Sequence, residues 1–286
     1  MAHLKGSTVS GRDTAGDYMA AIGLSLLFPV LRWTLHETVF QPVALHLLSD
    51  PPHQKGQLIP ARTFNKAQKF CEALWKFLVY GTFFALGLNA IHDQPYLRDT
   101  SFFWRGWPYQ QFGGRLRTLY CVEMAHYLSS VFMLLLWETR RKDFLVMMTH
   151  HLATLALIVL SYSADFVRVG SSIMVLHDAC DIFLEGAKML NYLKFEKTST
   201  AVFVVFVIVW IALRLVYFPF WIIHSTSWGM WTVLDYKTQS SWTIDALNAM
   251  LYLLLVMHIY WFVLIMKIAW CKITTGVSAD SREDDD

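Results

Sequence analysis

The sequence predicts an all-α protein that crosses a membrane about seven times. Hydrophobic residues make up 55% of the chain and charged residues only 16%, whereas a soluble domain normally carries about a quarter charged residues. The mean hydropathy is +0.38, and apolar windows of about 20 residues, the length that spans a bilayer as a helix, recur along the chain. The net charge of +2 is too small to indicate a nucleic-acid partner.

Seven apolar windows are the predicted transmembrane helices, at residues 18–39, 73–91, 116–137, 144–162, 167–190, 201–223 and 244–270. The first follows basic residues, but Asp13 and Asp17 intervene and no signal-cleavage site follows, so we expect a retained membrane anchor. We expect one membrane domain over residues 73–272. Residues 1–72 would form the amino terminus, the anchor and the first loop, and residues 273–286 an acidic, disordered tail.

The distribution of Lys and Arg predicts the orientation of the helices. Loops and tails on one side of the predicted bundle carry twelve of these residues, and those on the other side, which include the amino terminus, carry seven. Because cytosolic loops are enriched in Lys and Arg, the amino terminus is expected to be lumenal. The carboxyl terminus is then expected to be cytosolic.

The fourth and fifth windows contain ionisable groups that are costly in hydrocarbon. The fourth carries His150 and His151, and the fifth carries His177, Asp178, Asp181, Glu185 and Lys188. At about 100° per residue, the five groups of the fifth window share one stripe of a helix about 100° wide. Ionisable residues inside a membrane normally face a protein interior or a wet cavity and mark a functional site.

Further ionisable groups lie at similar depth on other windows. His126 and His258 come to about the level of His177 at a rise of 1.5 Å per residue. Glu123 and Arg214 lie further toward the lumenal side, where we expect them to pair with each other or to close the inner end of a cavity.

This ordered set of residues resembles the Lag motif of ceramide synthases, a branch of the TLC family of membrane domains. The matching elements are R-R-K-D-F at 140–144, the pair His150-His151, Ser161-Tyr162, Arg168 with Gly170, H-D-x-x-D at 177–181, E-x-x-K at 185–188, and the stretches 213–221 and 258–262. The turn departs from the pattern, because Asp165 stands where Asn or Ser is expected.

The resemblance implies an acyltransferase of the endoplasmic reticulum membrane. Such an enzyme transfers a fatty acyl group from acyl-CoA, its co-substrate, to the amine of a sphingoid base. Only about thirty residues separate the first two windows, which leaves no room for the homeobox-like insertion of many animal members. The plant or fungal type is therefore expected. Membrane lipids are expected around the bundle, and a homodimer or heterodimer remains open.

The predicted catalytic residues are His150, His151, His177, Asp178 and Asp181. Exposing the lone pair of an amine with a pKa near 10 at neutral pH costs on the order of 4 kcal/mol, and a buried neutral imidazole can act as the base. Asp178 or Asp181 would orient that imidazole, and the adjacent His would donate to the oxyanion. Formation of an acyl-imidazole before amine attack remains an alternative.

The predicted substrate-binding residues are Arg140, Arg141, Lys142, Glu185, Lys188, Arg214 and His258. The basic run at 140–142, with Lys194 and Lys197 across the opening, could hold the phosphates of CoA or could simply set the topology. The sixth and seventh windows could wall an acyl tunnel near Arg214, with Ala212 as a small lining residue, although ordinary packing explains the same composition.

The same residues allow three other interpretations. A mononuclear metal site from His150, His177 and Asp181 is conceivable, but acyl transfer requires no metal, and we expect neither a metal nor another cofactor. A non-enzymatic TLC-type lipid-binding or trafficking protein would not need the His pair. A proton-coupled transporter would use intramembrane carboxylates, but no internal repeat is apparent.

Overall fold

The computed structural model describes residues 14–49, 60–111, 113–138, 142–234 and 242–275. Within these ranges the regular structure is helical throughout. The predicted phosphate contacts Arg140 and Arg141, and most of the acidic tail, lie outside the described residues.

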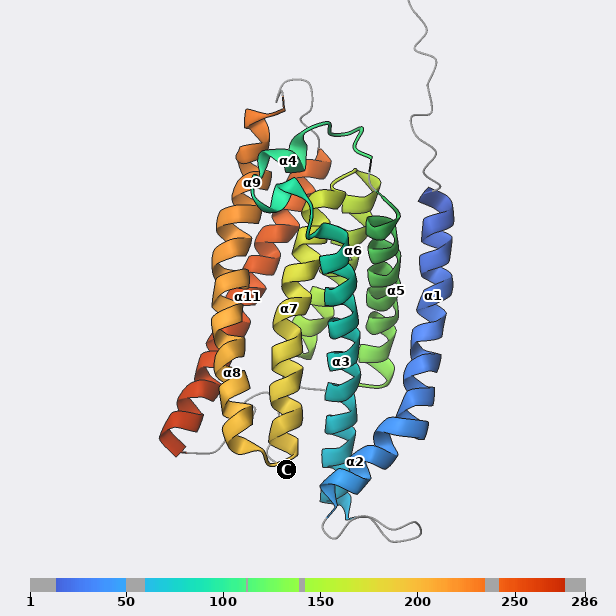
Figure 1. Cartoon of the computed structure of the whole chain (residues 1–286), viewed down its shortest axis with the longest axis vertical. Helices are drawn as coiled ribbons and strands as arrows, with labels where there is room; N and C mark the ends of the chain where they lie inside the picture. Colours follow the sequence, from blue (N-terminus) through green and yellow to red (C-terminus); the bar gives the residue numbers. More distant parts are fainter. Residues whose placement is uncertain (1–13, 50–59, 112, 139–141, 235–241, 276–286) are drawn as a thin grey trace, which may run out of the picture.

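Long helices run up and down in a single antiparallel bundle (Figure 1). They are α1 (Thr14–Leu35), which continues through the π-helix η1 (His36–Phe40) into α2 (Gln41–Leu48), α3 (Ala61–Ile91), α5 (Gly114–Leu136), α6 (Phe144–Ser163), α7 (Val167–Tyr192), α8 (Glu196–Trp210), which continues through the π-helix η3 (Ile211–Ile223) into α9 (His224–Ser227), and α11 (Trp242–Thr275).

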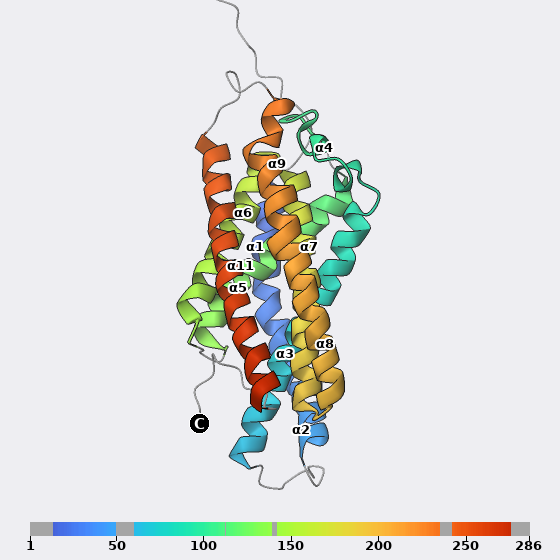
Figure 2. The same ribbon diagram turned by 90° about the vertical axis from the view of Figure 1, so that its left-hand side faces the viewer.

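Short helices cover the upper end of the bundle, which is the end at which α1 begins (Figure 1). They are η2 (Pro95–Leu97), α4 (Ser101–Trp104) and η4 (Gly229–Thr232). The described part of α11 ends at the opposite, lower end, beyond which α3 extends further than its neighbours (Figure 2). The chain therefore crosses the bundle an odd number of times, as the sequence predicts.

Six of the long helices are apolar enough to cross a membrane by length and composition. The remaining long helix, α7, has 26 residues and runs antiparallel to α6 and α8 inside the bundle. Its hydropathy is low because it carries the predicted polar stripe, whose cost in hydrocarbon is avoided by burial within protein. The structure thus agrees with the predicted all-α membrane fold of about seven spans.

Polar contacts hold α1 against the rest of the bundle at two levels. Near the upper end, the buried Asp17 carboxylate accepts hydrogen bonds from Arg117 on α5 and Tyr162 on α6. Near the lower end, Arg32 donates to Glu138 over 3.2 Å. Only 17% of the apolar window of this segment is buried, against 61% for α5, so these ionic contacts carry much of the specificity of its docking.

The turn between α6 and α7 explains why Asp165 can stand where the Lag motif leads us to expect Asn or Ser. Asp165 has φ of 60°, in the left-handed region where Asn and Asp are several-fold enriched among residues other than glycine. Aspartate therefore suits the backbone here about as well as the expected Asn. Close packing follows immediately, since a Cβ on Gly170 would meet the hydroxyl oxygen of Tyr120 at 1.9 Å.

Candidate active site

Helix α7 places the predicted polar stripe at the centre of the bundle. It packs most extensively against α3 and α8 and also contacts α5, α6 and η3. His177, Asp178 and Glu185 are buried as a result. Because neighbouring helices surround α7, the residues of the stripe face protein and contact different neighbouring helices.

Two cavities lie along this stripe. The wider extends toward the lower end and is lined by His150, His151, Asp181, Glu185, Lys188 and Arg214 among others. The narrower extends toward the upper end and is mostly apolar, with His177, Asp178, Glu123 and Thr154 among its lining residues. Tyr127 lines both cavities, and we call its surroundings the junction.

The histidine pair lies on the side of the wide cavity that faces the junction. The ring centroids of His150 and His151 are 5.7 Å apart, and that of His151 lies 5.8 Å from the ring of Tyr127. The Trp261 ring stands perpendicular to His150 at 5.2 Å. Neither Nδ1 atom of the two histidines has a hydrogen-bond partner. Both imidazoles therefore retain a ring nitrogen with which to exchange a proton or bind a substrate atom.

The carboxylates expected to orient the histidine pair have other partners. Asp181 accepts a hydrogen bond of 2.8 Å from Arg214, which also donates to the carbonyl of His177 over 3.0 Å and stacks on Trp210 at 4.2 Å. The expected pairing of Glu123 with Arg214 is thus wrong, because the guanidinium already binds Asp181, which lies one helical turn beyond Asp178 on α7.

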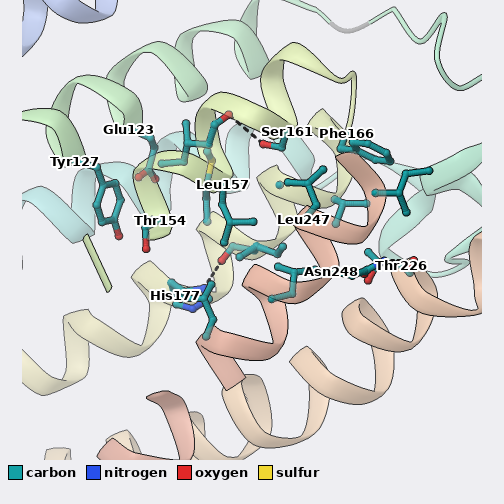
Figure 3. A pocket seen from close by; sticks show the side chains of 18 of the residues that line it. Glu123, Tyr127, Thr154, Leu157, Ser161, Phe166, His177, Thr226, Leu247 and Asn248 are labelled. Atoms are coloured by element: carbon teal, nitrogen blue, oxygen red, sulfur yellow. Dashed lines mark hydrogen bonds between the residues drawn. The ribbon is translucent and has the colours of Figure 1, made fainter. Parts of the chain in front are cut away.

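Asp178 instead forms a side-chain hydrogen bond with Glu123 of α5. Both carboxyls are buried, and each keeps one oxygen without a partner, Oδ2 of Asp178 and Oε1 of Glu123. Figure 3 shows Glu123, Tyr127 and Thr154 gathered at one end of the narrow cavity. The direct contact of Asp178 or Asp181 with the histidine pair that the sequence suggested is not present in this arrangement.

His177 and His258 form a second histidine pair, with their Nε2 atoms 2.9 Å apart. Nδ1 of His177 lies 2.7 Å from the carbonyl oxygen of Ile173, so it must carry the proton. Nε2 of His177 then accepts, and Nε2 of His258 donates. This arrangement fixes the His177 tautomer and ties α7 to α11, whereas His126 lines neither cavity and bonds Ser130 on its own helix.

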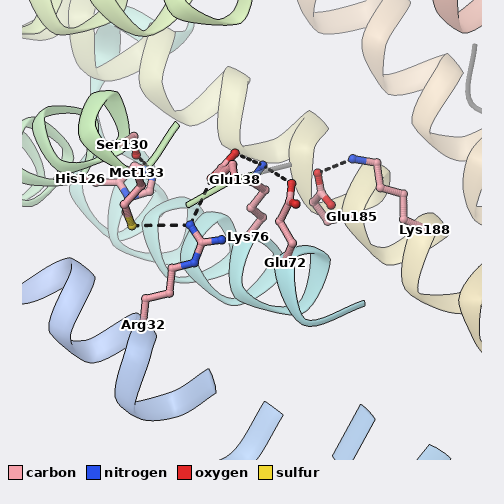
Figure 4. Close-up of polar contacts among 9 residues, drawn as sticks. All are labelled: Arg32, Glu72, Lys76, His126, Ser130, Met133, Glu138, Glu185 and Lys188. Atoms are coloured by element: carbon pink, nitrogen blue, oxygen red, sulfur yellow. Dashed lines mark hydrogen bonds and ion pairs between the residues drawn. The ribbon is translucent and has the colours of Figure 1, made fainter. Parts of the chain in front are cut away.

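An ionic network lines the lower part of the wide cavity (Figure 4). Lys76 bridges Glu72 at 2.9 Å and Glu138 at 2.8 Å, and Lys188 bonds Glu185 at 2.8 Å. The exposed residues Lys142, Lys194 and Lys197 do not line the cavity. Sequence reasoning missed Lys76, Glu72 and Tyr127, because each is a single residue on a long helix without a motif around it.

Two further expectations can be compared with the described residues. They contain no group of three or more His, Cys, Asp or Glu side chains placed to hold a metal ion.

Ala212, expected to line an acyl tunnel, is exposed on the outer face of η3 and lines neither cavity. That expectation is wrong for Ala212, and the apolar cavity is lined instead by α4, α5, α6, α7, α9, η4 and α11.

Comparison with known proteins establishes the family. The pattern of the TLC domain matches residues 69–267, and the chain is 39% identical to "Ceramide synthase LOH2" of Arabidopsis thaliana over 94% of this chain and 93% of that protein. The chain belongs to the ceramide synthase family. Among other ceramide synthases, "Ceramide synthase 1 LOH3" of the same plant is 38% identical over 92% of this chain and 90% of its own length.

A human relative shares the membrane domain over a shorter stretch. "Ceramide synthase 5" of Homo sapiens is 38% identical over 76% of this chain but over only 54% of its own length. The plant ceramide synthases, by contrast, match over nearly the full length of both proteins. The predicted resemblance to the plant-type members of the family is confirmed.

Proposed function

We infer that this protein is a ceramide synthase, which transfers a fatty acyl group from acyl-CoA to the amine of a sphingoid base. The carbon–sulfur bond of the thioester breaks, an amide bond forms, and CoA leaves with the proton that the amine loses. The observation that carries this inference is the pair His150-His151, which lines a wide cavity inside a chain of this family and whose Nδ1 atoms have no hydrogen-bond partner.

The position of the wide cavity supports its assignment to acyl-CoA. The phosphates of CoA cannot enter hydrocarbon, so they must remain near the lower, Lys- and Arg-rich end, toward which this cavity extends. Arg140, Arg141 and Lys142 lie in the chain just before α6 and remain our proposed phosphate contacts. The thioester would then reach the histidine pair at the junction.

At the junction one imidazole would take the proton of the attacking amine, and the other would donate to the developing oxyanion. Asp181 would act through Arg214, which it holds against the carbonyl of His177. A direct attack by the amine and an acyl-imidazole on one His both fit this arrangement. Trapping an acylated histidine when acyl-CoA is supplied without base would establish the second route.

Purified protein offered a sphingoid base and acyl-CoAs of several chain lengths tests the function. We expect an amide product, identified by mass spectrometry, whose formation requires both substrates. A lipid-binding protein or a transporter would bind or move the base without changing its mass.

Full activity after exhaustive chelation is expected, since no step of acyl transfer requires a metal or another cofactor. Loss of activity that one metal restores would contradict this expectation.

The narrow cavity is the proposed site of the acyl chain. If CoA occupies the wide cavity and the thioester lies at the junction, the chain continues into the apolar cavity, where Leu247 of α11 is a buried lining residue. Leu247→Trp should therefore shift the products toward shorter acyl chains, as measured with an equimolar mixture of acyl-CoAs. Ala212→Trp, on the exposed face of η3, is the matched control. An unchanged distribution in Leu247→Trp would place the chain elsewhere.

We further propose that the protein resides in the endoplasmic reticulum membrane, with its upper end lumenal and its lower end cytosolic. The excess of Lys and Arg in the segments at the lower end supports this orientation. Protease protection of a carboxyl-terminal tag in sealed microsomes tests it: the tag should be digested, and a shielded tag would reverse the orientation.

A further inference from the structure

The attacking amine needs its own binding groups at the junction, and the histidine pair does not supply them. A sphingoid base arrives as an ammonium ion, because its amine has a pKa near 10. An imidazole offers no negative charge to a cation, and Asp181 and Glu185 are already paired with Arg214 and Lys188. The remaining carboxyls near the junction are Glu123 and Asp178, on the wall of the narrow cavity.

These two carboxyls form a pair that is incomplete by itself. Glu123 is 1% exposed and Asp178 is 2% exposed. Since carboxylate oxygens are acceptors only, the hydrogen bond between the two side chains requires one proton. A cation bound beside the pair would favour the charged form of the second carboxyl, and Oε1 of Glu123 and Oδ2 of Asp178 have no partner with which to share it.

The surroundings of the pair do not provide the missing cation. No Lys or Arg lines the narrow cavity among the described residues, and the nearby Arg214 is bound to Asp181. The hydroxyl oxygen of Thr154, at the same end of the cavity, also lacks a partner (Figure 3). Buried charges are normally paired and buried polar atoms hydrogen bonded, so this end of the cavity lacks a donor-rich, positively charged group.

We propose that Glu123 and Asp178 bind the ammonium head group of the sphingoid base, with the hydroxyl of Thr154 accepting a further hydrogen bond. A primary ammonium has three donors and no acceptor, which matches the three unpartnered oxygen atoms. The proposal rests on the proposed function and deepens it, because it names the groups that recognise the second substrate. Acyl-CoA carries no cation, so this site distinguishes the base from the acyl donor.

Equilibrium binding of a radiolabelled sphingoid base to the purified full chain in nanodiscs, without acyl-CoA, tests the site. The competitor is a long-chain 1,3-diol of equal length, which keeps hydroxyl groups but lacks the amine. The wild type should prefer the amine by about tenfold or more, as expected for a buried charge-assisted hydrogen bond. Glu123→Gln should lose this preference while its affinity for the diol stays unchanged.

Three comparisons make the result decisive. Glu123→Asp retains the carboxylate and should keep most of the preference, and Asp93→Asn removes a carboxylate from a half-exposed pair with Arg115 and should keep all of it. If Glu123→Gln still prefers the amine, or loses amine and diol affinity equally, the pair is a structural contact and the proposal falls. Thermal melting identifies a variant that has failed to fold. If Glu123→Gln does not fold, the preference of Glu123→Asp for the amine over the diol, compared with that of the wild type, decides whether the proposal stands.

The binding measurement also separates this proposal from the proposed function. A wild type that prefers the amine but forms no amide product would keep the head-group site and refute the acyltransferase. A wild type that forms the amide, with an apparent KM for the base unchanged in Glu123→Gln, would refute the site and keep the enzyme.

Discussion

His150→Ala and His151→Ala are each expected to abolish amide formation while leaving the protein folded. General acid–base catalysis by a positioned side chain contributes about 10²-fold to 10⁴-fold to a rate, and both imidazoles line the wide cavity and have an Nδ1 atom without a hydrogen-bond partner. Turnover with saturating acyl-CoA and base measures the loss, and thermal unfolding in the same detergent confirms that the fold persists.

His92→Ala provides the matched control for this prediction. His92 is an exposed histidine at the end of α3, where its Nδ1 lies 3.0 Å from the carbonyl oxygen of Leu88. The control should turn over as the wild type does. Near-wild-type turnover in either member of the His150-His151 pair would remove that residue from the chemistry.

Arg214→Lys is expected to lower both stability and turnover, although it preserves the positive charge. The guanidinium makes three contacts at once, with Asp181, the carbonyl of His177 and the ring of Trp210. A lysine ammonium cannot reproduce that planar fork. Removing one partner of a buried pair typically costs about 3–5 kcal/mol in unfolding free energy. Because lysine keeps the charge and Asp181 is only partly buried, we expect a smaller loss, measured by thermal and denaturant unfolding.

A double replacement separates the structural role of Arg214 from its role in positioning the site. Arg214→Met with Asp181→Leu removes both charges, and replacing a buried pair with apolar residues is often neutral or stabilising. We expect stability to recover in the double variant but turnover to remain low, because the His177 carbonyl loses its donor. Recovery of turnover together with stability would show that the pair serves the fold alone. Arg115→Lys, in a half-exposed ion pair, is the control.

Much of the fold could be predicted from the sequence, because membrane helices must be long and apolar and satisfy their backbone internally. The polar stripe of α7 was also predictable, since a helix places residues three or four apart on one face. That stripe is the reason that α7 is less apolar than the other long helices, and it is what located the site.

The division of the site into two cavities could not be predicted. Asp178 and Asp181 lie one turn apart on the same face, yet one meets Glu123 of α5 and the other meets Arg214 of η3. Helical periodicity gives the direction of a side chain but not which neighbouring helix stands there. For the same reason the composition around Ala212 suggested a tunnel, although that residue lies on the outer face of η3.

The reaction itself is tested most directly with a sphingoid base labelled with ¹⁵N and an acyl-CoA labelled with ¹³C in the acyl chain. Purified wild-type protein should release an amide that carries both labels, in amounts equal to the CoA thiol formed, and neither His150→Ala nor His151→Ala should do so. An unlabelled or singly labelled product, or a doubly labelled amide formed equally well by both variants, would contradict N-acylation at this histidine pair.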